Sequence, residues 1–157
     1  MRVTVISDSH RRSSVIDRIL SAEPESRDIF FLGDITADIE DYELLYPDKR
    51  FHIVSGNCDF YSKYPSTDIA DITGIKIYYT HGHTLGVKYG TDNLKKSALA
   101  AECRIALYGH THISKISYED GLYIVNPGSC SAPRDGAASY AVVDIEKNGI
   151  MPVIKKL

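Results

Sequence analysis

Five short apolar runs in this chain each lead into a cluster of aspartate, asparagine or histidine. The clusters are Asp8-Ser9-His10, Gly33-Asp34, Gly56-Asn57-Cys58-Asp59, His81-Gly82-His83 and Gly109-His110-Thr111-His112. Side chains that follow the carboxyl ends of strands in an α/β sheet lie at one edge, so we expect these clusters to converge. Carboxylate, amide and imidazole donors suit divalent metal ions. The pattern therefore predicts a metal centre in which two ions share a carboxylate, and hydrolysis of a phosphate ester.

The first third of the chain alternates between predicted strands and helices. In chain order the expected elements are a strand at 3–6, a helix at 13–22, a strand at 29–32, a helix at 38–46 and a strand at 51–54. Ser13 can cap the first helix, and Ile39, Tyr42 and Leu45 share one face of the second. Strands separated by helices pair in parallel through right-handed crossovers.

The remainder of the chain is richer in strands. We expect a hairpin from 69–72 and 75–80, a helix at 92–102, a strand at 105–108, and from residue 113 several short strands with turns at Asp120-Gly121, Pro127-Gly128 and Asn148-Gly149. The last of these turns is the strongest hairpin signature. The pattern favours an α/β (α+β) fold of two packed sheets with helices outside. With 157 residues and no linker, the chain is expected to form one domain, 1–157.

Charge and composition narrow the expected partners. The formal net charge is -3 and the pI is near 6.0, without a basic stripe, so long nucleic acid is not expected as a partner. The apolar run at 3–6 is too short for a signal peptide or a membrane span, which favours a cytoplasmic protein without membrane association. Three scattered cysteines fit a reducing compartment.

Two clusters share a spacing that suits metal binding. In Asp8-x-His10 and His110-x-His112 the paired residues are two apart, and such residues face the same way in an extended segment. Gly109 would let the backbone approach closely. Alone, either pair is also typical of a turn with a surface histidine, and the recurrence of clusters favours metal binding.

In this order the five motifs resemble the calcineurin-like metallophosphoesterase superfamily. The chain length and the Asn126-Pro127-Gly128-Ser129 turn, followed by Pro133-Arg134, are similar to its small, single-domain YfcE-type phosphodiesterase branch. The resemblance covers essentially the whole chain. It implies a four-layer αββα sandwich of two mixed sheets with a two-metal site at one edge.

The resemblance also implies a ligand set of seven residues. One metal would be held by Asp8, His10 and His112, the other by Asn57, His81 and His110, and both by a bridging Asp34. Manganese is the metal we expect, while nickel, iron, cobalt and zinc suit the same donors. Two such ions would activate a hydroxide to attack phosphorus without a covalent intermediate.

Four further residues have expected roles near the metals. Cys58 occupies the position at which many superfamily phosphatases have a histidine that protonates the leaving group, so we expect a bias toward good leaving groups or diesters. Asp59 would orient a ligand or water. Arg134 suits phosphate contact, or else forms a surface ion pair. His83 either faces the substrate, supports a ligand or is a packed histidine.

The leading interpretation is a dinuclear metal-dependent phosphodiesterase acting on small phosphate diesters. An alternative is a protein-binding scaffold of the same fold, as in the retromer subunit related to this family. A phosphomonoesterase, or an enzyme that cleaves dinucleoside polyphosphates, is a further alternative. The expected partner is a small phosphate ester, and the sequence leaves open whether the chain forms a homo-oligomer.

Overall fold

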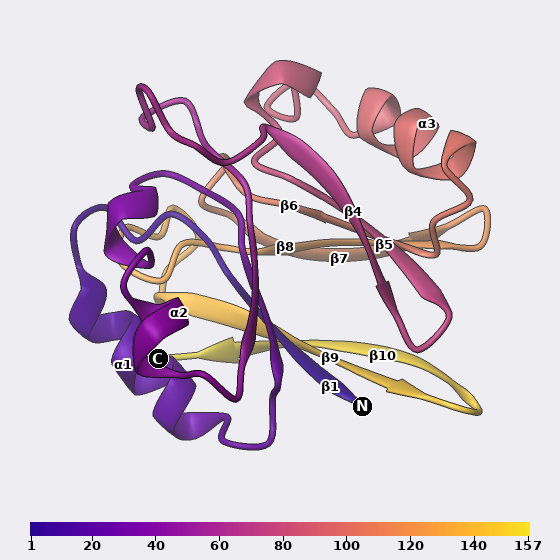
Figure 1. Cartoon of the computed structure of the whole chain (residues 1–157). Helices are drawn as coiled ribbons and strands as arrows, with labels where there is room; N and C mark the ends of the chain where they lie inside the picture. Colours follow the sequence, from indigo (N-terminus) through magenta and orange to yellow (C-terminus); the bar gives the residue numbers. More distant parts are fainter.

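Two five-stranded sheets lie face to face in the computed structural model, which describes all of residues 1–157 (Figure 1). The first sheet contains β1 (Arg2–Ile6), β2 (Asp28–Phe31), β3 (Arg50–Ile53), β9 (Ser139–Glu146) and β10 (Gly149–Lys156), in the order β10-β9-β1-β2-β3. The second contains β4 (Thr67–Ile72), β5 (Ile75–Thr80), β6 (Ile105–Tyr108), β7 (Ser114–Glu119) and β8 (Leu122–Pro127), in the order β4-β5-β6-β8-β7.

Both sheets are mixed, and the parallel strands set the position of the candidate site. In the first sheet β2 pairs in parallel with both β1 and β3, as the alternation of strands and helices predicted. In the second, β6 pairs in parallel with β5 and β8. The edge strand β4, by contrast, forms the predicted antiparallel hairpin with β5. The carboxyl ends of three strands therefore share one edge in each sheet.

The main core lies between the sheets, and two smaller cores lie under the helices. Val5 and Phe30 of the first sheet join Leu107 and Val125 of the second in one buried cluster. Helix α1 (Ser13–Ala22) packs Ile16, Ile19 and Leu20 on the outer face of the first sheet. Helix α3 (Asp92–Ala100) packs Leu94 and Ala98 on the outer face of the second. These layers form the predicted αββα sandwich.

The predicted helix at 38–46 is wrong in extent. The structure has instead a 3-10 turn, η1 (Thr36–Asp38), and one short helical turn, α2 (Tyr42–Leu45). Ile39 and Tyr42 are buried as expected, but Leu45 is 66% exposed. Tyr46 stacks on Tyr42, with ring centroids 5.8 Å apart, and packs against the core under α1. Because the chain does not form one continuous helix from 38 to 46, the helical periodicity is interrupted, and Leu45 does not lie on the same buried face as Ile39 and Tyr42.

Three smaller predictions about element ends can be compared with the structure. Ser13 does not cap α1: it is the first helical residue, Arg12 occupies the cap position, and no side-chain capping bond forms. The helix predicted at 92–102 ends at Ala100. The hairpin predicted at Asn148-Gly149 is confirmed, with Gly149 paired to Glu146 in the ladder.

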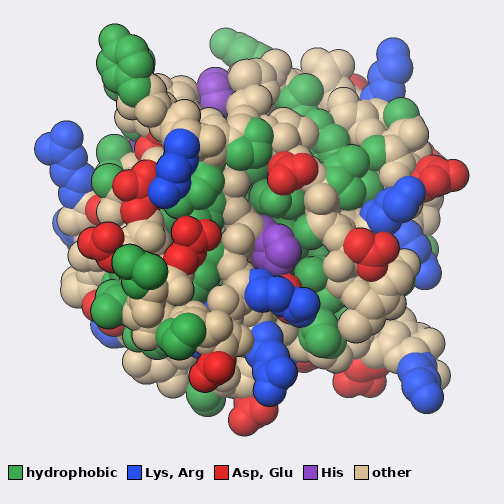
Figure 2. Space-filling view, in the orientation of Figure 1, with side chains coloured by type: hydrophobic (Ala, Val, Ile, Leu, Met, Phe, Trp, Pro, Cys, Tyr) green, Lys and Arg blue, Asp and Glu red, His purple; other side chains and the backbone are tan.

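The surface offers no long stripe of one charge on the face shown in Figure 2, where lysine and arginine are interspersed with aspartate and glutamate. None of the helices combines the length and apolar character needed to cross a membrane.

Candidate metal centre

All seven predicted ligands follow the carboxyl ends of strands, at the edge that the two sheets share. In chain order, Asp8 and His10 follow β1, Asp34 follows β2, Asn57 follows β3, His81 follows β5, and His110 and His112 follow β6. Three strands of one sheet and two of the other thus supply the side chains. The topology brings together residues that are far apart in the chain, such as His10 and His112, which are separated by 102 positions.

One group of donors consists of Asp8, His10, Asp34 and His112. Each offers one ligand atom, and these atoms lie within 4.8 Å of one another. His112 Nε2 lies 3.2 Å from Asp8 Oδ1 and 3.2 Å from His10 Nε2. Two carboxylates and two imidazoles at these distances can hold a divalent metal ion.

A second group surrounds His81. Its Nε2 lies 3.1 Å from Asn57 Oδ1, 3.0 Å from His110 Nδ1 and 3.5 Å from Asp34 Oδ1. Asp34 therefore borders both groups of donors. The sharing of this carboxylate by two ions, and the assignment of the second group to an ion, stay predictions.

Backbone carbonyls fix the orientation of two imidazoles. His81 Nδ1 lies 2.7 Å from the Leu32 carbonyl oxygen, and His112 Nδ1 lies 2.7 Å from the Ala132 carbonyl oxygen. A carbonyl can only accept, so Nδ1 of each ring carries the proton. The lone pair of Nε2 then points into the site, as a metal ligand requires.

Asp8 shows that the donor set fits a cation. Its Oδ1 atom is buried without a hydrogen-bond donor, because the nearby His112 nitrogen does not have hydrogen-bond geometry. Its Oδ2 atom accepts from the Ser7 hydroxyl at 2.6 Å and the His110 backbone N–H at 3.2 Å. A buried carboxylate oxygen without a partner is costly, and a metal ion would satisfy it.

The backbone at the candidate ligands is mostly left-handed. Asp8, His10, Asp34, His110 and His112 all have φ between 46° and 67°. Non-glycine residues rarely adopt this region, and such residues gather at functional sites. The extended geometry expected for Asp8-x-His10 and His110-x-His112 is therefore wrong. Tight turns, not the alternation of a strand, aim both members of each pair at the site.

Glycines allow this close packing. A Cβ atom on Gly109 would lie 2.1 Å from Ser7 Oγ, so the close backbone approach expected there is confirmed. A Cβ atom on Gly56 would lie 2.2 Å from Asp34 Oδ1. Both contacts are far shorter than any side chain tolerates.

Asp59 holds the loop that carries Asp34. Its Oδ1 accepts the backbone N–H groups of Ile35 and Thr36 at 2.8 and 2.7 Å. Its Oδ2 accepts those of Asp34 and Gly56 at 3.0 and 2.7 Å. Four backbone donors occupy the carboxylate. Asp59 therefore orients the candidate bridging ligand through the main chain.

The sequence predicted no supporting role for a set of residues at the end of β8 and on the loop that follows it. Ser129 Oγ and Ser131 Oγ donate to the Asp8 carbonyl oxygen at 2.7 and 3.1 Å. Asn126 Nδ2 donates to the Gly109 carbonyl oxygen at 3.0 Å. The Asn-Pro-Gly-Ser turn was the available sequence signature, because its polar side chains directly follow a buried strand.

Charges in the site shift three pKa values. Burial would raise the pKa of Asp8, but the neighbouring His112 ring, the charge of His81 and the Ser7 hydroxyl outweigh it, and the pKa is lowered. The Asp8 carboxylate raises the pKa of His112 against the effect of burial. Burial, His81 and Lys88 lower the pKa of His110 to about 4. At neutral pH, Asp8 is ionised and His110 is neutral, the forms that bind metal.

Cys58 is exposed beside the second group. Its backbone N–H donates to Asp34 Oδ1 at 3.0 Å, and its Sγ accepts from Asn57 Nδ2 at 3.3 Å. Burial of the sulfur and the Asp34 carboxylate raise the pKa of Cys58 to about 11. The thiol therefore stays protonated at neutral pH and adds no charge to the site.

Arg134 is joined to a residue of the first group, and His83 lies near a residue of the second. The Arg134 backbone N–H donates to the His112 carbonyl oxygen at 2.9 Å. Its guanidinium is exposed, its charge reaches His112, and it forms none of the ion pairs in the structure. The ring of His83 lies 5.4 Å from that of His81, and its Nδ1 atom is buried without a partner. A contact of either residue with substrate stays a prediction.

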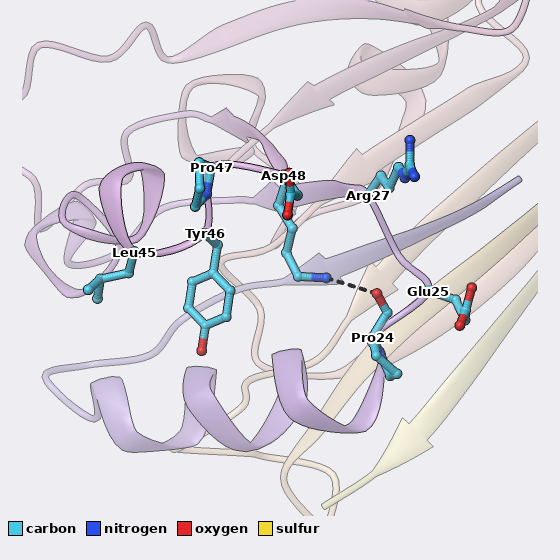
Figure 3. Close-up of a pocket in the computed structure, with 8 residues that line it drawn as sticks. Pro24, Glu25, Arg27, Leu45, Tyr46, Pro47 and Asp48 are labelled. Carbon is cyan, nitrogen blue, oxygen red and sulfur yellow. Dashed lines mark hydrogen bonds between the residues drawn. The ribbon is translucent and has the colours of Figure 1, made fainter.

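A separate pocket of about 490 Å³ lies at the opposite end of the first sheet (Figure 3). The segments preceding β2 and β3 line it, and its walls carry Arg27 and Lys49 together with Glu25 and Asp48. Lys49 Nζ donates to the carbonyl oxygens of Pro24 and Ser26 at 3.3 and 2.7 Å. None of the candidate metal ligands lies there.

Comparison with known proteins gives consistent matches. Residues 1–148 match the model of the calcineurin-like phosphoesterase superfamily domain. Probable metallophosphoesterase YsnB of Bacillus subtilis is 29% identical over 150 residues, covering 94% of this chain and 86% of YsnB. Vacuolar protein sorting-associated protein 29 of Schizosaccharomyces pombe is 29% identical over 160 residues, covering 93% and 86%. Phosphodiesterase YfcE of Escherichia coli is 32% identical over 80 residues, covering 50% and 38%.

A solved structure shares the fold. It is a conserved uncharacterized protein from Streptococcus pneumoniae TIGR4, described as a predicted phosphoesterase. The TM-score is 0.86 at 28% identity, and the match covers 99% of this chain and 88% of that chain.

Proposed function

The chain belongs to the calcineurin-like phosphoesterase superfamily, and from this premise we propose that it is a metal-dependent phosphodiesterase of small phosphate diesters. The observation that carries the proposal is the meeting of two donor groups at one carboxylate, Asp34. The similarity to YfcE, a phosphodiesterase, supports the same reaction class.

In this proposal the ligands divide between two ions. Asp8, His10 and His112 hold one, Asn57, His81 and His110 hold the other, and Asp34 binds both. Manganese is the metal proposed, while nickel, iron, cobalt and zinc suit the same donors. When bound, two such ions supply Lewis acidity and a low pKa for water between them.

The protein's own side chains bind and orient the ester. The exposed, unpaired guanidinium of Arg134, whose charge reaches His112, can donate to a non-bridging phosphate oxygen. The amide oxygen of Asn57 lies toward His81, and its Nδ2 gives one N–H to Cys58 Sγ and keeps the other for phosphate. Asp59 fixes the Asp34 loop so that these groups keep their spacing.

Cys58 favours diesters with good leaving groups over simple monoesters. A thiol whose pKa is raised to about 11 is a weak proton donor to a departing alkoxide at neutral pH. It also lacks the positive charge with which an imidazolium would attract the dianion of a monoester. Diesters whose leaving group departs as a stable anion need neither a proton donor nor an added positive charge.

The test is a screen of metal-depleted protein against a nitrophenyl diester and the matching monoester, with each metal added back singly. We expect hydrolysis that depends on added metal, is fastest with the diester, and disappears with a chelator. Elemental analysis should give two equivalents of metal at saturation. A single equivalent, with full activity, would contradict the shared-carboxylate arrangement.

The scaffold alternative has a specific basis in the similarity to vacuolar protein sorting-associated protein 29. A scaffold would not need seven donors with oriented imidazoles, yet all seven are present here. Metal binding without turnover of any ester in the screen would favour the scaffold. Faster turnover of the monoester would favour a phosphomonoesterase.

A further inference from the structure

A shallow pocket of about 340 Å³ lies next to the candidate metal centre and has no role in the function proposed so far. One wall is the loop 87–91, which follows the His-Gly-His cluster. The other wall includes Thr111, which lies between His110 and His112 in the chain, and Lys115 at the start of β7. The pocket and the metal centre therefore share the segment that carries two candidate ligands.

The charge of this pocket is unusual for the molecule. Lys88 and Lys115 line it, no aspartate or glutamate does, and the chain as a whole has a net charge of -3. Neither lysine forms an ion pair, whereas Lys95 and Lys155 do. The pocket shown in Figure 3, by comparison, carries two cations and two anions. Two unpaired ammonium groups in one hollow form an anion-binding surface.

The pocket is close enough to the metal centre for one substrate to reach both. Thr111 lines the pocket and directly follows His110 in the chain, and Tyr108 of β6, two residues before His110, lines it as well. Tyr89, next to Lys88, is 98% exposed and presents an aromatic ring at the rim. A ligand with an anionic group in the pocket could stack a planar group on this ring.

We propose that this pocket, defined by Lys88, Tyr89, Thr111 and Lys115, binds a second phosphate of the substrate. The proposal rests on the proposed function and narrows its substrate class. The favoured diesters carry an additional phosphate on one arm, and that arm runs from the metal centre past His110 into the pocket. Diesters without the second phosphate are poorer substrates.

Two matched substrates test the preference. The nitrophenyl ester of thymidine 5′-phosphate is compared with the same ester carrying a 3′-phosphate, in wild type, Lys88→Gln, Lys115→Gln and Lys147→Gln. Lys147 lies in the exposed turn between β9 and β10 and serves as the charge-matched control. We expect kcat/KM about fivefold higher for the 3′-phosphorylated ester, the size of two solvent-exposed ion pairs. Each pocket variant removes one of the two pairs and should reduce the preference to about twofold, whereas Lys147→Gln should keep it.

Equal kcat/KM for the two esters in wild type would overturn the proposal, as would an equal loss on both esters in the pocket variants. A binding experiment keeps the result independent of catalysis. Metal-free, nitrogen-15-labelled protein in chelator is titrated with thymidine 3′,5′-bisphosphate and followed by amide chemical shifts. We expect shifts at residues 88, 89, 111 and 115, with affinity reduced about threefold in each pocket variant. Shifts confined to other residues would overturn the pocket even if the enzyme is active.

Discussion

At the scale of single residues, Asp34 has the most connected position in the site. Its carboxylate borders both donor groups, and its Oδ1 accepts the Cys58 backbone N–H. His112, by contrast, contacts only the group that contains Asp8 and His10. The two residues should therefore respond differently to substitution.

We expect Asp34→Asn to abolish metal binding at both positions, because a neutral amide bridges two cations poorly. His112→Ala should leave about one equivalent bound. Elemental analysis after gel filtration in saturating manganese measures both. The same stoichiometry in the two variants would show that Asp34 is not the bridge.

Cys58 should tune substrate choice rather than folding, because its side chain is exposed. Cys58→His restores a proton donor, and general acid catalysis is worth about 10² to 10⁴-fold where the leaving group needs it. We expect the ratio of monoester to diester turnover to rise in Cys58→His and to change little in Cys58→Ser. Rates measured across leaving groups of different pKa check this. If Cys58→His and wild type respond identically, pocket shape sets the preference.

At the scale of elements, one buried carboxylate joins α1 to the first sheet. Glu23, at the C-terminal cap of α1, is 2% exposed and contacts Arg2 of β1 at 3.2 Å, the Tyr140 hydroxyl of β9 at 2.9 Å, and Lys155 of β10. Burial would raise the pKa of Glu23, but Lys155, Tyr140 and Arg2 outweigh it and lower the pKa. The ionised form is therefore the form that stabilises the fold.

This network makes part of the stability dependent on pH. Because the folded pKa of Glu23 lies below its ordinary value of 4.5, its contribution is complete above about pH 4.5 and is lost as the pH falls through the folded pKa. We expect Glu23→Gln to lower the free energy of unfolding by about 1–2 kcal/mol at pH 7, since both cationic partners are partly exposed. Urea denaturation at pH 7 and pH 3 should show this difference shrink.

The matched control is Glu146→Gln, an exposed glutamate at the end of β9. It should change the free energy of unfolding by less than about 0.5 kcal/mol at either pH. A Glu23→Gln difference that stays constant between pH 7 and pH 3 would contradict the role given to the carboxylate.

Elements with local determinants were predictable from the sequence. The parallel strands and the hairpin at Asn148-Gly149 follow from short apolar runs and turn residues, and the structure has them. Leu45 was misplaced because only tertiary contacts decide where a short helix breaks. The left-handed turns at Asp8 and His10 could not be read from spacing, which does not encode φ.

The support of the site was less predictable than its donors. Asp59 contacts backbone amides of another loop, and Ser129 reaches the Asp8 carbonyl oxygen across 121 positions in the chain. Such contacts depend on the packed sheets and leave no local pattern. The residue types that can bind a metal ion, however, follow from their chemistry alone. The sequence could therefore indicate Asp34 and His81 as candidate metal ligands.

At the scale of the whole molecule, the candidate metal centre joins the two sheets. Asp8, Asp34 and Asn57 follow strands of the first, and His81 and His110 follow strands of the second. Metal bound there would hold the edges of the sandwich together, and anything that binds the folded form alone stabilises it.

We expect saturating manganese to raise the melting temperature of metal-depleted protein by about 5 to 10 °C, if free metal exceeds Kd by about 100-fold. Differential scanning calorimetry measures the shift, chelator should reverse it, and Asp34→Asn should not show it. An unchanged melting temperature at saturating metal would mean that the sheets do not depend on the ions.

The order of strands along the chain also determines when, during synthesis of the polypeptide, the candidate metal centre can assemble. His10 lies against His112, 102 positions later, and β1 pairs with β9, whose residues 139–146 are synthesised after all seven candidate ligands. A nascent chain on the ribosome therefore exposes its amino-terminal donors long before it has their counterparts. We therefore expect the centre to assemble only after residues 139–146 have been synthesised, and a polypeptide truncated before β9 to lack an assembled centre.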